Sequence, residues 1–436
     1  MNPIGALRQR LGRDKLSQDI AWTLGSFVVL AASGIVINIV VTRLRDADAL
    51  GVFNQAYAVY IIVSQFAVWG MHYSVLRHAA LFDTDPAERG RMLATAGLCS
   101  LLLGTLAACA LWLAQPLLAS AFDSAPTGRA VGYGALGLIL FPLNKVLLAY
   151  LNGLRRMKAF SLLQGVRYAV VMVVVAAVAA SPWPVEMATF AFAVAEAVTA
   201  SGAMFYIARR QLTGPLVPMR AWVKKHFAFG SKGLMAGMFA EVNSRIDVLL
   251  IGAFLSDRAV GIYSFAAMLV DGLYHVLAMV RINFNPLLVA AMRDGDWAQA
   301  QRLLSRSKRL VWPLTVVLSF VVVAGFWLLA TIVGTDKGLL EGLPSLVILL
   351  AGLTLISALV PFDNLLMVVG HPGYQTLQQL ATVGTNAVIA VLLLPVLGIE
   401  GAAIGTAASY LAGIIMLTLF AHRVVRWNLL SNRIGI

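Results

Sequence analysis

The sequence predicts an all-α polytopic membrane protein, with about twelve transmembrane helices arranged as two sets of six. Three observations support this fold class. Of the 436 residues, 60% are hydrophobic and only 12% are charged, whereas soluble domains have about 25% charged residues. Apolar runs of membrane-spanning length recur along the chain. A basic segment near the middle of the chain separates six of these runs from the other six.

The apolar runs are continuous rather than alternating, which favours helices over the strands of an outer-membrane barrel. The first run follows a polar, basic segment and is itself long enough to span, so we expect no cleavable signal peptide. We predict twelve spans, at residues 22–42, 51–72, 93–115, 131–151, 162–180, 185–207, 231–255, 259–284, 311–333, 343–369, 379–397 and 400–420.

The distribution of lysine and arginine predicts the orientation in the membrane. An even number of spans places the tails 1–21 and 421–436 on the same side. These tails and the loops on their side hold 25 of the 33 Lys and Arg residues, with Arg167 counted in the loop before the fifth span, and the opposite loops hold five. The positive-inside rule therefore predicts cytoplasmic termini. The net charge of +13 is attributed to these loops and not to a nucleic-acid surface.

The longest and most basic loop, residues 208–230, divides the chain into an N-terminal lobe (22–207) and a C-terminal lobe (231–420). The two halves share a sequence pattern. ALGVFNQA (49–56) and AVGIYSFA (259–266) both fit Ala-x-Gly-[Val/Ile]-aromatic-x-x-Ala, and each begins the second span of its half. The offset of 210 residues indicates an internal repeat, and two six-helix lobes are a common plan for transporters.

Three stretches of the chain resemble the multidrug/oligosaccharidyl-lipid/polysaccharide exporter superfamily. Within it, they resemble the polysaccharide-transport branch, which contains Wzx-type flippases and exopolysaccharide export proteins. The stretches are TRLRDADALGVFNQA (42–56), FGSKGLMAGMFAEVNSRIDVLLIGAFLSDRAVGIYSFA (229–266) and TNAVIAVLLLPVLGIEGAAIGTAASYL (385–411). The third stretch is the most specific, with Asn, a long apolar run, Pro and then Gly-x-x-Gly-Ala-Ala.

The resemblance implies two six-helix lobes around a central cavity and transport by alternating access. It also implies a lipid-diphosphate-linked oligosaccharide as the cargo. Twelve spans fit the polysaccharide branch, whereas the related lipid II flippases usually have fourteen. Because none of the three stretches is a catalytic motif, the resemblance identifies the superfamily better than the substrate.

Ionisable residues within the predicted spans are the candidate site, because such residues are costly in a bilayer and are often functional. In span 7, Glu241 and Arg245 are four residues apart and are expected to share one helix face. Asp247 is expected on another face. In span 8, Asp271 and His275 are again four residues apart. The remaining candidates are Lys145 in span 4, Glu196 in span 6, Arg281 in span 8, and Asp363 beside Pro361 in span 10.

Arginine binds phosphate oxygens through a planar fork, and lysine binds them as a mobile point charge. We therefore predict that three cations, Arg245, Lys145 and Arg281, bind a diphosphate headgroup in the central cavity. The other ionisable residues have two open interpretations. They either pair with the cations or couple transport to a proton or sodium gradient. This second group is Glu241, Asp271, His275, Glu196 and Asp363.

No cofactor and no metal site are expected. The six histidines are scattered without metal-ligand spacing. Cys99 and Cys109 are ten residues apart in one apolar helix, so a structural disulfide between them is not expected. The chain shows no nucleophile–base pattern or phosphate loop, and an enzyme is therefore not expected.

The leading hypothesis is a flippase or exporter of the bacterial inner membrane. It would move undecaprenyl-diphosphate-linked oligosaccharide repeat units to the periplasmic leaflet for exopolysaccharide or lipopolysaccharide synthesis. A cation-coupled multidrug exporter of the same superfamily and a non-transporting component of polysaccharide assembly are the alternatives. The partners considered are the lipid-linked substrate, membrane lipids, H+ or Na+, and polysaccharide polymerase and export machinery. Nucleic acid is not among them.

Overall fold

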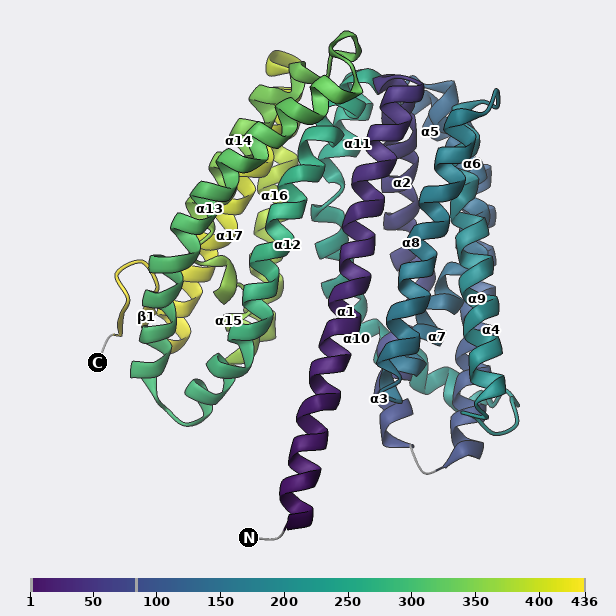
Figure 1. Cartoon of the computed structure of the whole chain (residues 1–436), viewed down its shortest axis with the longest axis vertical. Helices are drawn as coiled ribbons and strands as arrows, with labels where there is room; N and C mark the ends of the chain where they lie inside the picture. Colours follow the sequence, from purple (N-terminus) through teal and green to yellow (C-terminus); the bar gives the residue numbers. More distant parts are fainter. Residues whose placement is uncertain (1–2, 83–84, 435–436) are drawn as a thin grey trace. The chain divides into compact units, whose positions relative to one another are not determined.

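The computed structural model describes residues 3–82 and 85–434, and nearly all of these are helical (Figure 1). A two-stranded antiparallel hairpin follows the last helix. The elements are α1 (Pro3–Leu44), α2 (Ala47–Val68), α3 (Met71–Leu81), α4 (Pro86–Leu113), α5 (Gln115–Ala121), α6 (Ala125–Ala135), η1 (Leu136–Ile139), α7 (Phe141–Gly153), α8 (Met157–Ala180), η2 (Val185–Phe190), α9 (Ala191–Arg209), α10 (Arg220–Asn243), α11 (Ile246–Phe254), α12 (Asp257–Arg293), α13 (Trp297–Val333), η3 (Thr335–Lys337), η4 (Leu339–Gly342), α14 (Leu343–Ile356), η5 (Val360–Phe362), α15 (Leu365–Val368), α16 (Pro372–Leu397), α17 (Ile399–Val425), β1 (Trp427–Asn428) and β2 (Arg433–Ile434).

The chain forms two compact units, whose boundaries cut through two helices. Unit 1 comprises the residues up to Leu44 and Val59–Met238, and unit 2 comprises Arg45–Ala58 and Phe239–Ile436. Helix α2 therefore contributes its first part to unit 2 and its remainder to unit 1. Helix α10 is divided in the same way, at Met238.

Among the described residues, ten helices are long and apolar enough to cross a membrane. The bent pair of α6 with η1 and α7, which meet at an angle of 41°, passes the same test together and makes eleven segments in all. Pro142 lies in the first turn of α7, where proline is tolerated in the helix it begins but blocks continuation of the preceding one. These eleven segments correspond to all the predicted spans except 231–255.

The predicted span 231–255 is present as two helices. Helix α10 ends at Asn243 and the nine-residue α11 begins at Ile246. Arg245 lies between them with φ −132° and ψ −11°, outside the helical region. The prediction that Glu241 and Arg245 share a helix face is therefore wrong, because it required a continuous helix across residues 241–245.

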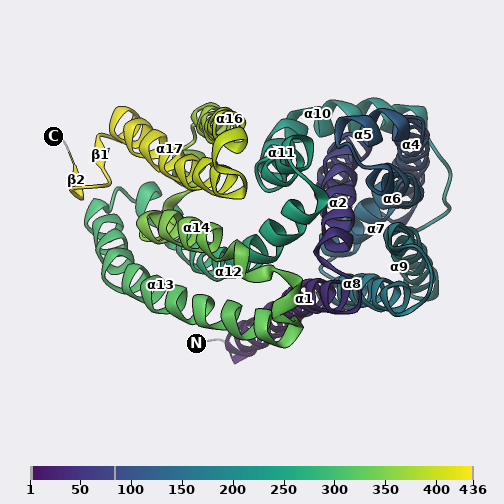
Figure 2. The ribbon, with the colours of Figure 1, turned by 90° about the horizontal axis from the view of Figure 1, so that it is seen from above.

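Unit 1 has a core in which α7 contacts α3, α4 and α9 (Figure 2). Buried side chains from these helices, among them Met71, Met92 and Tyr150, pack with Leu212 and Trp222 of the segment after α9. In unit 2, a separate core joins α12, the start of α13 and α17 to the hairpin, with Trp427 at its centre. Lys308 Nζ donates to the carbonyls of Leu429 and Leu430 and so attaches the hairpin to α13.

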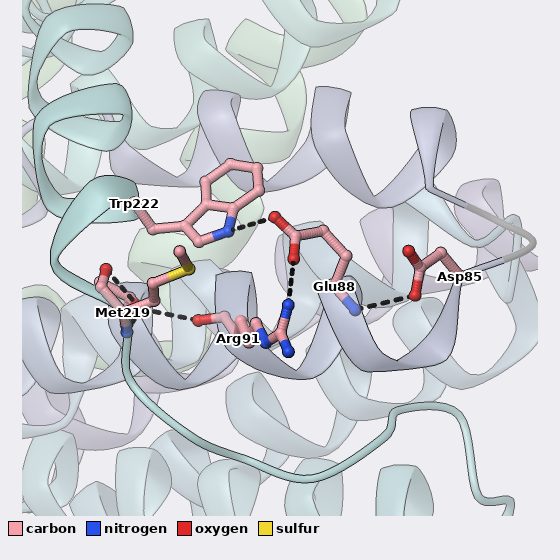
Figure 3. Close-up of polar contacts among 6 residues, drawn as sticks. Asp85, Glu88, Arg91, Met219 and Trp222 are labelled. Atoms are coloured by element: carbon pink, nitrogen blue, oxygen red, sulfur yellow. Dashed lines mark hydrogen bonds and ion pairs between the residues drawn. The ribbon is translucent and has the colours of Figure 1, made fainter.

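The segment after α9 is attached to unit 1 by hydrogen bonds along its length. Gly214 N donates to Pro86 O at 2.7 Å, and Met219 N donates to Thr95 Oγ1 at 2.9 Å. The Trp222 indole donates to Glu88 Oε1 at 2.9 Å (Figure 3). Glu88 lies in the first turn of α4, which Asp85 caps. The basic loop predicted as a linker between the lobes therefore has fixed contacts with α4.

His226 lies on α10 at the end of this segment, outside the predicted spans, and is completely buried. Its Nε2 donates to Met92 O at 3.2 Å, so its Nδ1 accepts the Ser74 hydroxyl at 2.9 Å. Burial lowers the pKa of His226 from 6.5 to about 4, although its hydrogen bond to Met92 O acts in the opposite direction. The imidazole is therefore neutral at neutral pH.

The two repeated sequence patterns begin α2 and α12. Helix α1 ends at Leu44 and α2 begins at Ala47, while α11 ends at Phe254 and α12 begins at Asp257, which preserves the offset of 210 residues. Their glycines make reciprocal contacts. A β-carbon at Gly51 would collide with the Asp257 carbonyl oxygen, and one at Gly261 would collide with the Ala47 carbonyl oxygen. The repeat therefore specifies a backbone-to-backbone crossing of two helix starts within unit 2.

Replacement of Gly51 by alanine should lower the stability of the protein by about 1–3 kcal/mol, because the new methyl group overpacks this crossing. Gly384→Ala is the matched control, since it adds the same group on α16 where no atom lies within 4 Å. That control should be neutral or slightly stabilising, because alanine favours a helix. Thermal unfolding of the purified protein in detergent measures both, and equal melting temperatures for the two variants would contradict the packing argument.

Acidification should weaken the attachment of the 210–226 segment. The unfolded chain binds a proton at His226 below about pH 6.5 and the folded chain does so only below about pH 4, so stability falls as the pH falls through this window. The expected loss by pH 5 is about 2 kcal/mol. Unfolding at pH 7.5 and pH 5 measures it, with His226→Gln as the variant that lacks this contribution. The same pH-dependent loss in both proteins would refute it.

Candidate functional site

The predicted site residues lie in both units, and Asp247 of unit 2 belongs to a hydrogen-bonded group. Asp247 is 8% exposed and lies in the first turn of α11. Tyr263 of α12 donates its hydroxyl to Asp247 Oδ2 at 2.6 Å, and Val248 N donates to Oδ1 at 2.9 Å. Tyr263 Oη is also 3.4 Å from Thr406 Oγ1 on α17. A hydrogen-bonded polar chain therefore joins α11, α12 and α17.

Arg245 occupies the break between α10 and α11. Its guanidinium carbon lies 4.9 Å from the centre of the Tyr57 ring, a cation–π distance. Its Nε is buried without a hydrogen-bond partner among the described residues. In the described part of the chain no ion pair joins Arg245 to Glu241 or to Asp271. An unsatisfied buried donor is costly, so this side chain is suited to a ligand with acceptor oxygens.

Asp271 and His275 lie on α12 and are both exposed, although they fall within a predicted span. They are one helical turn apart, so they lie on the same side of α12. An exposed carboxylate at this depth is not stable against lipid. These two residues are therefore expected to face water or cargo.

Arg281 and Asp363 form a pair in unit 2. Arg281 Nη1 is 3.1 Å from Asp363 Oδ2, and Gln378 Nε2 donates to Asp363 Oδ1 at 2.9 Å. About a fifth of each charged side chain is exposed. Asp363 directly follows the short 3-10 helix η5, which contains Pro361. Of the two interpretations proposed for Asp363, the structure shows pairing with a cation.

Glu196 also has a cationic partner, but one that the sequence did not indicate. Its Oε1 accepts from Nε and Nη2 of Arg167, at 2.7 and 2.5 Å, and its Oε2 accepts from Asn144 Nδ2 at 2.6 Å. Arg167 was assigned to a cytoplasmic loop, whereas it lies within α8. This correction leaves 24 cations on the cytoplasmic side against five, so the predicted orientation does not change. The sequence did indicate a position within the membrane for Arg167, because residue 167 falls inside the predicted span 162–180.

Lys145 lies on α7 in unit 1, where its Nζ is 5.4 Å from the centre of the Phe141 ring. The structure thus pairs Arg281 with Asp363, and it places Lys145 and Arg167, the partner of Glu196, against the Phe141 ring. It does not bring Glu241 or Asp271 into an ion pair with Arg245. Within the described residues, no group of His, Cys, Asp and Glu side chains could hold a metal ion.

Comparison with known proteins identifies the family. A family model described as polysaccharide biosynthesis protein matches residues 16–282, more than half of the chain. The chain belongs to this family. This family agrees with the polysaccharide-transport branch that the sequence motifs resemble. No curated protein matches the chain.

Solved structures show the same fold at low sequence identity. The lipid II flippase MurJ in an inward closed conformation has a TM-score of 0.74 at 11% identity, covering 93% of this chain and 88% of that chain. An inward-facing multidrug resistance MATE family transporter has a TM-score of 0.71 at 14% identity, with coverage of 92% and 96%. A superfamily transporter from Pyrococcus furiosus has a TM-score of 0.56 at 13% identity, with coverage of 94% and 95%. The predicted fold class is confirmed, and this family member is a multi-pass membrane protein.

Removal of the Tyr263 hydroxyl should destabilise the protein by about 1.5–3 kcal/mol, because Tyr263→Phe removes a hydrogen bond to a buried carboxylate. Tyr133→Phe is the control, since that tyrosine is 37% exposed and its hydroxyl can exchange to water. Unfolding midpoints of the two variants in the same detergent measure the difference. Indistinguishable midpoints would show that Asp247 does not depend on Tyr263.

Proposed function

We propose that this polysaccharide biosynthesis protein is a flippase of the bacterial inner membrane with both termini in the cytoplasm. Its cargo would be an undecaprenyl-diphosphate-linked oligosaccharide repeat unit, moved to the periplasmic leaflet by alternating access. The product would serve exopolysaccharide or lipopolysaccharide synthesis, with a polymerase and export machinery acting next. Family membership supports the general role, and the arrangement around Arg245 supports the headgroup chemistry.

Arg245 is the single residue on which the proposal depends most. It lies at a helix break within a span, and transporters use such discontinuous helices to bind substrate in the membrane. Its buried, unpartnered Nε offers a donor that a diphosphate oxygen would satisfy. Glu241, three residues before the break at Ser244, would then lower the net positive charge near Arg245 without forming an ion pair with it.

Arg281 in unit 2 and Lys145 in unit 1 would each act as a further cation for a headgroup, within its own unit. A diphosphate that approached Arg281 would compete with Asp363 for the guanidinium, so this pair could open when cargo binds. Gln378 would keep Asp363 satisfied during the exchange. A paired cation of this kind binds an anion without leaving an isolated charge in the empty transporter.

A cation-coupled multidrug exporter is the alternative that one observation favours. Asp271 and His275 are exposed on one side of α12, and a protonatable pair within a span is typical of ion-coupled transport. The two functions differ in what is transported. Drug accumulation measured with and without a proton or sodium gradient detects the second function directly.

Deletion of the gene should cause lipid-linked repeat units to accumulate in the inner leaflet and should abolish surface polysaccharide. Wild-type protein should restore export, and Arg245→Gln should reduce it at least tenfold at equal expression, because the headgroup loses its mid-span cation. Quantification of lipid-linked oligosaccharides by mass spectrometry and of exported polysaccharide measures both effects.

Arg258→Gln is the matched control, because Arg258 forms an exposed pair with Glu341 at the end of unit 2 and should be replaceable. Normal polysaccharide and no lipid-linked intermediate in the deletion strain would overturn the proposed function. Full export by Arg245→Gln would exclude Arg245 from the mechanism and leave the function intact.

A further inference from the structure

Helix α13 carries a row of arginines on its outer surface, near its start. They are Arg302, Arg306 and Arg309, and all three are exposed. Their spacing of four and then three residues places them on one face of the helix, over a length of ~10 Å. We call them the α13 basic row. The row lies entirely within unit 2 and takes no part in the groups of ionisable residues described above.

The opposite face of this part of α13 is buried in the core of unit 2. Leu303 and Leu304 pack there with Trp427 of the hairpin, and Ser307 Oγ donates to Ala358 O at 2.6 Å. An isolated amphipathic segment of this kind would lie flat on a membrane, with its apolar face in the lipid. Here the protein itself covers that face. The basic row is therefore held facing outward.

Acidic side chains compensate the row only weakly. Among the described residues, the side chains of Arg306 and Arg309 have neither an ion pair nor a hydrogen bond. Arg302 is 3.7 Å from Asp296, but this pair is exposed on both sides, and such pairs contribute little. Asp296 also precedes the helix, more than one turn before Arg302. The outer face of the row therefore has a net positive charge.

The exposed apolar side chains of α13 mark the part of the helix that lies in the hydrocarbon core. They begin at Leu310 and end at Ile332. At 1.5 Å per residue the segment between them covers ~33 Å, close to the ~30 Å thickness of that core. The remainder of the 37-residue helix, including the basic row, therefore extends beyond the hydrocarbon.

The row lies at the depth of the lipid headgroups. Arg309 directly precedes Leu310, Arg306 is ~6 Å before it and Arg302 is ~12 Å before it along the helix. The headgroup layer of each leaflet is about 5–8 Å thick. Arg306 and Arg309 therefore lie within this layer, and Arg302 lies at its outer edge.

The C-terminal hairpin, which lies beside the start of α13, places an apolar side chain at the same depth (Figure 1). Lys308, in the turn of α13 that carries the last two arginines of the row, donates from Nζ to Leu430 O at 2.6 Å. Asn428 Oδ1 accepts from the backbone nitrogens of Leu430 and Ser431, which fixes the turn. The Leu430 side chain is left 67% exposed. Exposed cations beside an exposed leucine match the boundary between headgroups and acyl chains.

We propose that the α13 basic row binds anionic phospholipids of the surrounding leaflet, with the headgroup phosphate against the arginines and the acyl chains against Trp312. A guanidinium binds phosphate oxygens through two parallel hydrogen bonds. Each cation near an anionic membrane surface strengthens association by about fivefold, whereas a zwitterionic headgroup brings its own positive charge. The surface is independent of the cargo, so its failure would leave the proposed function unchanged.

Trp312 serves as a reporter for this surface, because it is 46% exposed and lies one turn beyond Arg309. The full-length protein is reconstituted in vesicles of equal parts phosphatidylglycerol and phosphatidylcholine, with bromine on the acyl chains of one lipid at a time. Bromine quenches tryptophan fluorescence on contact, and the difference between wild type and Trp312→Phe isolates the signal of Trp312. Association of phosphatidylglycerol at Trp312 should exceed that of phosphatidylcholine about tenfold.

The combined variant Arg302→Gln, Arg306→Gln and Arg309→Gln should lose this preference, so that both lipids quench Trp312 equally. Lysine at the same three positions should retain most of the preference, because the charge remains. Sodium chloride at ~1 M should remove the preference in wild type, because it screens exposed charges. A preference that survived the glutamine substitutions or the salt would overturn the inference.

The matched control removes three exposed arginines of unit 1 by the combined substitutions Arg209→Gln, Arg210→Gln and Arg220→Gln. It should retain the wild-type preference at Trp312. An equal loss in this control would show only a general attraction to the basic end of the protein and would overturn the binding surface. Equal quenching by both lipids in wild type would also overturn it, and the row would then be available to an acidic protein segment.

Free phosphate is the other source of the same chemistry. Excess inorganic phosphate, added at constant ionic strength, should leave the preference for phosphatidylglycerol unchanged, because a soluble anion lacks the acyl chains that hold the lipid beside Trp312. Loss of the preference under these conditions would identify a site for free phosphate and would overturn the lipid-binding surface.

Discussion

Every ionisable side chain inside an apolar helix must be compensated, and this requirement determines how the helices of each unit pack. Glu196 joins α7, α8 and α9 through Asn144 and Arg167. Asp363 joins α12 and α16 in the same way, through Arg281 and Gln378. A buried ion pair adds little net stability, but removal of one partner is strongly unfavourable. These pairs therefore act mainly to specify which helices are neighbours and in what register.

The ionisable residues that lack such compensation are the ones that indicate a functional site. Arg245 has a buried nitrogen without a partner among the described residues, and Asp271 and His275 are exposed at a depth where lipid would not tolerate them. Compensation that the chain does not provide must come from water, ions or cargo. Unit 2 thus leaves a buried guanidinium nitrogen to be satisfied by something that moves through the membrane.

Local sequence features predicted the fold, because hydropathy and charge asymmetry are local quantities. They gave the approximate positions of eleven of the twelve predicted spans, the fold class and the repeat. Two site predictions failed for physical reasons. The shared face of Glu241 and Arg245 assumed an unbroken helix, and no proline or glycine marks the break at Ser244. Arg167 was counted with a loop although it falls inside the predicted span 162–180. Its pairing with Glu196, 29 residues away, could not be predicted, because hydropathy does not reveal which helices pair.

The repeat also shows at which positions the second half has polar residues where the first half has apolar ones. At the offset of 210 residues, Gly51 corresponds to Gly261, and both remain glycine because two backbones cross there. Phe53 corresponds to Tyr263, and Ile37 corresponds to Asp247. The first half has an apolar residue at both of the latter positions, whereas the second half has a tyrosine whose hydroxyl donates to an aspartate. A buried carboxylate without a donor and a buried hydroxyl without an acceptor are both costly. The tyrosine at 263 and the aspartate at 247 therefore depend on each other. The glycines at the backbone crossing are thus common to both halves, and the hydrogen-bonded chain from Asp247 to Thr406 is specific to the second half.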